Sequence, residues 1–202
     1  MNCPTCKHAN REGARFCENC GAKIAPVCAQ CGHQLRQSAK FCDACGVGLT
    51  AEHIRVYTDG GCSGNPGPGA WAFVIVGGKE EVSRSGTELR TTNNRMELKA
   101  AINGLRETKA TAGTIANLEV HTDSSYVCKG ITQWIHHWVK SDWKSSTKDP
   151  VKNQELWVEL KQLSDQISPI WRWVRGHSGN RYNEICDKMV KNAINDLKQR
   201  RQ

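Results

Sequence analysis

The sequence lacks any apolar run long enough to cross a membrane, because a spanning helix needs about 20 such residues. It also lacks the start of a secretory signal, since Met1-Asn2-Cys3-Pro4 has neither a basic charge nor an apolar stretch behind it. Apolar residues make up only 38% of the 202 residues, which excludes two large domains but allows one ordinary core and a small second module. We therefore expect a cytoplasmic protein with no membrane contact.

Acidic residues are in deficit over the chain. Asp and Glu number 20 against 28 Lys and Arg, and the formal net charge is +8. Such a balance favours a polyanionic partner, although charge alone does not identify it.

Cysteine is abundant, with eleven residues, and eight of them fall within the first 45 positions. These eight form the pattern Cys-x2-Cys-x10-Cys-x2-Cys twice, with an offset of 25 residues. The offset also matches Arg15-Phe16 with Lys40-Phe41 and His8 with His33. The N-terminal part therefore contains an internal duplication of one small unit.

Each unit is too short to bury a core, so it needs another source of stability. Four thiolates around one tetrahedral Zn²⁺ provide it and leave no coordination position for water. Disulfides are the alternative, but they do not suit a chain without a secretory signal. We predict two structural Zn²⁺ ions, one for unit 3–20 and one for unit 28–45, with the ligands Cys3, Cys6, Cys17, Cys20, Cys28, Cys31, Cys42 and Cys45.

Residues 1–46 resemble a double zinc ribbon, which implies binding of nucleic acid or protein. Residues 1–50 hold six Lys and Arg against three Asp and Glu, yet two zinc–tetrathiolate centres bring the formal charge close to −1. Both kinds of ligand therefore stay open. The available phosphate partners are Arg11, Arg15, Lys23, Arg36 and Lys40.

The rest of the chain predicts a mixed α/β domain over residues 54–198, after a linker at 47–53 and before a polar tail at 199–202. Helical spacing begins after the capping residues Thr91 to Asn94, and Ser124 and Asn153 precede two further helices. Three turn-connected strands followed by crossovers predict a five-stranded mixed sheet flanked by helices. The expected strands are 54–58, 70–76, one within 81–89, 118–122 and 169–174, and the last helix is expected at 183–198.

Four acidic residues are expected at the ends of strands or in helices of this domain. Asp59 and Asp123 are expected at strand ends that lie side by side, Glu97 in a helix, and Asp187 in the first turn of the last helix. Taken singly, each would be a solvated surface group.

Together the motifs resemble the type 1 ribonuclease H family over residues 54–197. They are TDGGCSGNPGPG, TTNNRMEL, TDSSYV, GITQWI and WVRGHSGNRYNEICD, in the family order. The resemblance implies an endonuclease that cleaves the RNA strand of RNA/DNA hybrids. It makes Asp59, Glu97, Asp123 and Asp187 the metal-binding carboxylates and His177 a mobile proton-transfer residue.

Phosphodiester hydrolysis explains this set of side chains. Two Mg²⁺ ions about 4 Å apart can serve both ends of an in-line displacement, and they require oxygen ligands. We expect two active-site Mg²⁺ ions, which Mn²⁺ can replace, and products with 5′-phosphate and 3′-hydroxyl ends.

Substrate contacts are also expected from the resemblance. Asn65, Thr92 and Asn93 match its polar positions, and Lys140 and Lys144 belong to its basic protrusion, here residues 129–152. Phosphate and backbone contacts imply little sequence preference. The expected partner is an RNA/DNA hybrid bound by a monomer.

Two other functions compete with this one. A DDE transposase or integrase places its glutamate last, whereas Glu97 comes second here. A non-enzymatic hybrid-binding protein would not need four intact acids and His177.

Overall fold

A computed structural model describes residues 53–78, 80–111, 117–145 and 147–200, and within the first 52 residues it describes 3, 5, 6, 8–11, 14, 16–22, 28, 31–33, 35, 39 and 41–46. Most of the expected linker and the end of the tail lie outside this range. So do Arg15, Lys23, Arg36 and Lys40. The domain boundaries themselves remain predictions.

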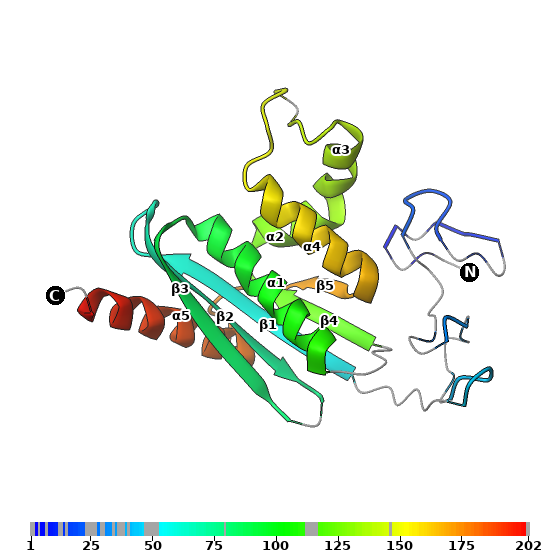
Figure 1. Cartoon of the computed structure of the whole chain (residues 1–202), viewed down its shortest axis with the longest axis horizontal. Coiled ribbons are helices and arrows are strands. Elements are labelled where there is room, and N and C mark those ends of the chain that lie inside the picture. Colours follow the sequence, from blue (N-terminus) through cyan, green and yellow to red (C-terminus); the bar gives the residue numbers. More distant parts are fainter. Residues whose placement is uncertain are drawn as a thin grey trace.

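The domain that follows the ribbons is a five-stranded mixed sheet with helices, as expected (Figure 1). Its strand order is β3-β2-β1-β4-β5, in which β1 pairs antiparallel with β2 and parallel with β4. Strands β2 and β3 pair antiparallel, and β4 and β5 pair parallel. The elements are β1 (His53–Cys62), β2 (Gly67–Val76), β3 (Val82–Thr91), α1 (Asn93–Thr111), β4 (Asn117–Thr122), α2 (Ser125–Lys129), the π-helical turn η1 (Gly130–Trp134), α3 (Ile135–Lys140), α4 (Gln154–Ile167), β5 (Ile170–Trp173) and α5 (Arg181–Gln199).

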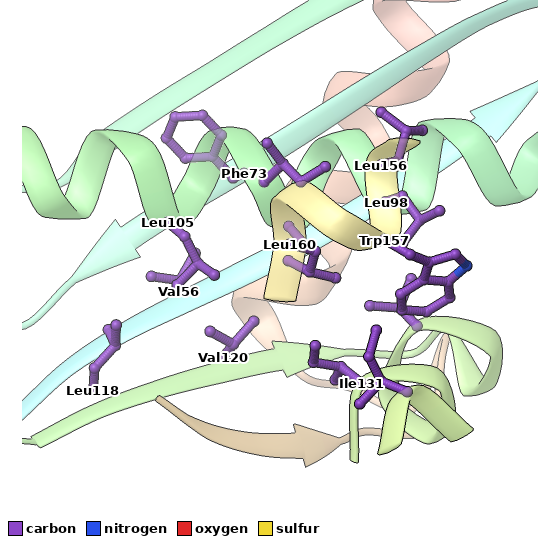
Figure 2. Close-up of a cluster of buried hydrophobic side chains, with 14 of the residues drawn as sticks. Val56, Phe73, Leu98, Leu105, Leu118, Val120, Ile131, Leu156, Trp157 and Leu160 are labelled. Carbon is purple, nitrogen blue, oxygen red and sulfur yellow. The ribbon is translucent and has the colours of Figure 1, made fainter. Parts of the chain in front are cut away.

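Alternating side chains divide the core between the two faces of the sheet. Val56, Phe73 and Val120 point to the face covered by α1 and meet Leu98 and Trp157 there (Figure 2). The opposite face, with Tyr57 among others, packs against α5. Each face therefore has its own apolar cluster, and the strands between them are held on both sides.

The protrusion contains η1 and α3, neither of which the sequence analysis delimited. Two of its tryptophans, Trp138 and Trp143, pack against the main core, whereas Trp134 is partly exposed. The ring of Trp138 lies 5.2 Å from that of Trp157, and Trp134 lies 6.2 Å from Tyr126. The Trp157 indole N–H also donates a hydrogen bond to the Tyr126 hydroxyl at 3.0 Å.

Two expected positions are wrong. Asp59 lies inside β1, because the strand continues through Gly60 and Gly61, which pair with Trp71 and Ala70. Asp187 lies in the second turn of α5, because Asn180 caps the helix two residues earlier than expected.

No helix in the described part of the chain is long and apolar enough to span a membrane.

Candidate active site and cysteine clusters

Three of the four expected acids meet at the centre of the sheet. Asp59, Glu97 and Asp123 each offer a carboxylate oxygen, and the three oxygens lie within 4.8 Å of one another. Asp59 comes from the middle of β1, Glu97 from the first turns of α1, and Asp123 from the residue after β4. Three oxygen ligands at this spacing can hold a divalent cation such as Mg²⁺.

Close contact between β1 and α1 brings Asp59 and Glu97 together. A Cβ atom on Gly60 would lie 2.3 Å from the backbone nitrogen of Glu97, so only glycine fits there. Asp123 joins them because β1 and β4 are parallel neighbours, with Thr58 opposite Thr122. Residue by residue, the topology therefore explains how these acids become adjacent.

Burial and crowding favour the protonated forms of Asp59 and Glu97. Burial, together with the charges of Asp123 and Asp187, raises the pKa of Asp59 to about 7, although His177 and a backbone hydrogen bond at Gly60 act in the opposite direction. Burial raises the pKa of Glu97 well above its ordinary value, with further contributions from Asp59 and Asp123. A cation among them would relieve this repulsion.

Glu97 also carries a buried oxygen, Oε2, that has no hydrogen-bond partner. Such an atom is costly in a protein interior unless something else satisfies it. A bound cation would do so, so the residues present fit a divalent metal.

Asp187 stands apart from the three clustered oxygens. Its Oδ2 accepts a hydrogen bond from Lys191 at 2.6 Å, one turn further along α5. It still lies near enough to raise the pKa of Asp59. His177 is exposed on the loop before α5, with φ of 50°, and it lowers the pKa of Asp59. All five expected residues therefore lie close enough to take part in the electrostatics of the same site.

The expected substrate residues fall into two groups. Asn65 and Asn93 are adjacent, since the Asn93 backbone N–H donates to Asn65 Oδ1 at 3.3 Å, and Asn93 Oδ1 accepts from the Cys62 backbone at 3.0 Å. Thr92 directly precedes Asn93. Lys140 and Lys144 lie on the separate protrusion, at the end of α3 and in a bridge to Pro150.

Sequence reasoning missed two residues that support the acids. Asn183 is 2% exposed, and its Nδ2 donates to Asp123 Oδ2 at 3.0 Å. It belongs to the motif WVRGHSGNRYNEICD, which could have indicated it. Lys191 lies outside every motif, and only its i,i+4 spacing from Asp187 gave a signal.

The eight N-terminal cysteines gather in the two sets of four that the spacing predicts. The Sγ atoms of Cys6 and Cys17 are 3.5 Å apart, and those of Cys28 and Cys45 are 3.6 Å apart. A zinc tetrahedron with bonds of about 2.3 Å places its sulfurs about 3.8 Å apart. No described cysteine forms a disulfide, so both sets fit structural zinc.

Comparison with known families agrees with both parts. The family model described as RNase H matches residues 51–195, and the one described as Double zinc ribbon matches residues 3–46. Among curated relatives, Ribonuclease H of Treponema denticola is 49% identical over 158 residues, covering 72% of this chain and 99% of the relative. Ribonuclease H of Marinobacter nauticus is 47% identical over 147 residues, covering 73% and 97%.

Solved structures show the same fold. LC9-RNase H1, described as a type 1 RNase H with the type 2 active-site motif, is 32% identical with a TM-score of 0.61, covering 71% of this chain and 72% of that one. LC11-RNase H1 in complex with RNA/DNA hybrid is 22% identical with a TM-score of 0.54, covering 71% and 98%.

Proposed function

The chain belongs to the ribonuclease H family, with an added double zinc ribbon, and we propose that it hydrolyses the RNA strand of RNA/DNA hybrids with two Mg²⁺ ions. The observation that carries this proposal is the cluster of Asp59, Glu97 and Asp123, in which Glu97 has a buried Oε2 without a hydrogen-bond partner. Asp187 completes the proposed ligand set. We expect the enzyme to act as a monomer in the cytoplasm.

The four carboxylates would hold the ions. Bound Mg²⁺ supplies an activated water and stabilises the departing 3′ oxygen. Asp59 lies close enough to Asp123 and Asp187 for their charges, after burial, to raise its pKa, and it would hold the ions together with these acids. Asn183 fixes the orientation of Asp123 through its hydrogen bond, which leaves the other oxygen of that carboxylate to the metal.

His177 would manage protons beside this cluster. It is exposed on the loop before α5, and its charge lowers the pKa of Asp59. From there an imidazole can pass a proton to the leaving oxygen and assist the exit of the product. The products would carry 5′-phosphate and 3′-hydroxyl ends.

Substrate recognition would rest on polar and cationic groups around the acids. Asn65 and Asn93 are held in place by hydrogen bonds to backbone N–H groups, so their amide nitrogens remain available as donors to the nucleic acid. Thr92 directly precedes Asn93, and Lys140 and Lys144 offer positive charge to phosphates from the protrusion. These contacts would be made to the backbone of the nucleic acid and not to its bases, so we expect little sequence preference.

The ribbons have no open coordination position and would not take part in cleavage. Their proposed role is recruitment, of nucleic acid or of a protein. Mn²⁺ is expected to replace Mg²⁺ in the acidic site, because it also binds oxygen ligands.

The test compares substrates and chain lengths in one assay. Labelled RNA/DNA hybrid, duplex RNA and duplex DNA are incubated with Mg²⁺ and either the full chain or a chain without residues 1–50. We expect both proteins to cut only the RNA of the hybrid. Cleavage of duplex RNA at a similar rate, or none of the hybrid, would refute the proposal.

A further inference from the structure

Two large apolar side chains of the ribbons are turned to solvent. Phe16 is 57% exposed and Phe41 is 66% exposed. They occupy the same position in the two units, since the duplication offset of 25 residues relates them. A largely exposed phenylalanine gains little from the hydrophobic effect, so its repetition at the matched position of both units points to a role outside the fold.

The interior of the ribbons does not need these rings. Buried positions include Asn10 in the first unit and its counterpart Leu35 in the second, which packs with Cys28 and Cys42. At this one buried position the duplicated units have changed from amide to aliphatic, although the buried cysteines are the same in both. Both units have kept phenylalanine where it is exposed, which indicates a requirement of the surface.

Charge around each ring favours an anionic ligand. In the sequence a cation directly precedes each phenylalanine, Arg15 in the first unit and Lys40 in the second. The acid two residues after each ring is already engaged. Glu18 pairs with Arg11 at 3.3 Å, and Asp43 contacts His33 at 3.0 Å.

The combination of an exposed phenylalanine and a preceding cation occurs twice, which suits a ligand whose own chemical structure repeats. A nucleic-acid strand presents a base and a phosphate at every step, whereas a folded protein seldom offers the same epitope twice. Bases can stack on exposed aromatic rings only where they are unpaired, so a duplex is a poor ligand for both rings.

We infer that Phe16 and Phe41 are stacking platforms for the bases of single-stranded nucleic acid, with the adjacent cations at its phosphates. This rests on the proposed function, because it specifies what the ribbons recruit: the unpaired strand that continues from a hybrid. A second site on the same polymer raises the effective concentration of the hybrid at the acids.

The experiment measures binding of the full-length, zinc-loaded protein to fluorescent oligothymidylate and oligouridylate by anisotropy. Stacking contributes about 1–3 kcal/mol per base, so each of Phe16→Ala and Phe41→Ala should raise Kd about 5-fold or more. The double variant should weaken binding further. The two probes show whether the strand is preferably DNA or RNA, and either preference supports the inference.

Matched substitutions separate stacking from apolar docking. Phe16→Leu with Phe41→Leu keeps apolar area but removes the π-face, so it should bind as weakly as the double alanine variant, whereas the double tryptophan variant should bind at least as well as the parent. Ile170→Ala removes a 43% exposed apolar side chain from β5 and should leave Kd unchanged. Zinc content, measured for every variant, reports whether the ribbons are folded.

Three results would overturn the inference: no binding of either probe by the parent, an unchanged Kd in zinc-loaded alanine variants, or full binding by the leucine variant. The last would indicate apolar contact with the strand and not stacking. Cleavage of a blunt hybrid by the parent protein tests the proposed function separately, so failure of one is distinguishable from failure of the other.

Discussion

The cysteine clusters and the carboxylate cluster stand in opposite relation to the fold around them. Each cysteine set gathers ligands from a unit of fewer than 20 residues, whose only described apolar cluster, in the second unit, consists of Cys28, Leu35 and Cys42 with Ala39 beside them. The acids instead project from β1, α1 and β4, which are held by apolar clusters on both faces of a sheet. In the ribbons the metal stabilises the fold, whereas in the catalytic domain the fold forces acids together that would otherwise repel.

Negatively charged side chains that lie close together are therefore accommodated in two different ways in this protein. Four thiolates are acceptable only while zinc is bound, so their metal is structural. The acids can lie close together without metal because the pKa values of Asp59 and Glu97 are raised, which favours their protonated forms. A metal ion is therefore not needed to keep this region folded and could bind reversibly. The predictions below test the two halves of this comparison.

Removal of zinc should have the largest effect, and it should be confined to the ribbons. Binding of structural zinc supplies roughly 10–16 kcal/mol of folding free energy in small modules, so chelation should unfold them. All seven tryptophans lie between Trp71 and Trp173 and report only on the catalytic domain. We expect about two zinc ions per chain before chelation, and unchanged tryptophan fluorescence after it.

A strong change of tryptophan fluorescence on chelation would show that the two parts are not independent. Zinc content well below one per chain in carefully loaded protein would remove the structural assignment altogether. Cys17→Ser provides the local control, because it should lose one zinc ion and leave the second unit loaded.

Asp123→Asn should reduce hybrid cleavage by about 10²-fold or more while leaving the fold intact. Asparagine keeps the shape but removes a charge that would hold Mg²⁺, and loss of one preorganised electrostatic group typically has an effect of this size. His177→Ala should be milder. Asp196→Asn, an exposed acid on α5, is the matched control and should cleave normally. Near-normal turnover of Asp123→Asn would contradict the site assignment.

Asp59→Asn should stabilise the catalytic domain in buffer without added Mg²⁺. The pKa of Asp59 is about 7 in the fold against an ordinary 3.8, so its contribution to stability is complete below about pH 4 and is lost as pH rises to about 7. The variant has no such titration. It should therefore exceed the parent by about 2–4 kcal/mol at pH 8 and match it near pH 4.

Urea unfolding followed by tryptophan fluorescence at both pH values measures this difference. Saturating Mg²⁺ should shrink the advantage of the variant, because the parent then gains a ligand that the variant binds poorly. A variant that is less stable than the parent at pH 8 would show that burial and repulsion from the neighbouring acids do not destabilise the charged form of Asp59.

Deletion of residues 1–50 should have the smallest effect on chemistry. Every proposed catalytic residue lies between Asp59 and Asp187, so cleavage of a short blunt hybrid should stay within about 3-fold of the full chain. Steady-state kinetics with the two proteins side by side measure it. A truncated protein that folds but does not cleave would show that the catalytic domain depends on the ribbons.

Much of the domain could be predicted because its elements carry strong local signals. Ser124 caps α2 by accepting from the Val127 backbone, as expected from its capping preference, whereas Asn153 precedes α4 at the expected place but makes no side-chain cap hydrogen bond. The three antiparallel strands and the parallel placement of β1 and β4 also followed from turns and crossovers.

The errors have a common physical cause. The strand expected at 54–58 continues through Gly60 and Gly61, and position 60 requires glycine because a Cβ atom there would collide with the backbone of α1; such a tertiary contact is invisible in the local sequence. The hydrogen bond from Asn183 to Asp123 joins residues 60 positions apart, so the motif that contains Asn183 could indicate the residue but not its partner. The cysteine sets were easier, because all four ligands of each lie within 18 consecutive residues.

The most direct test of the account is hybrid cleavage with the two metals varied independently. Four samples of the same protein are compared: zinc-loaded or zinc-stripped, each with and without Mg²⁺. The account predicts that cleavage follows Mg²⁺ alone, so that the zinc-stripped protein with Mg²⁺ cuts a short blunt hybrid and the zinc-loaded protein without Mg²⁺ does not. Cleavage that follows zinc instead would contradict it.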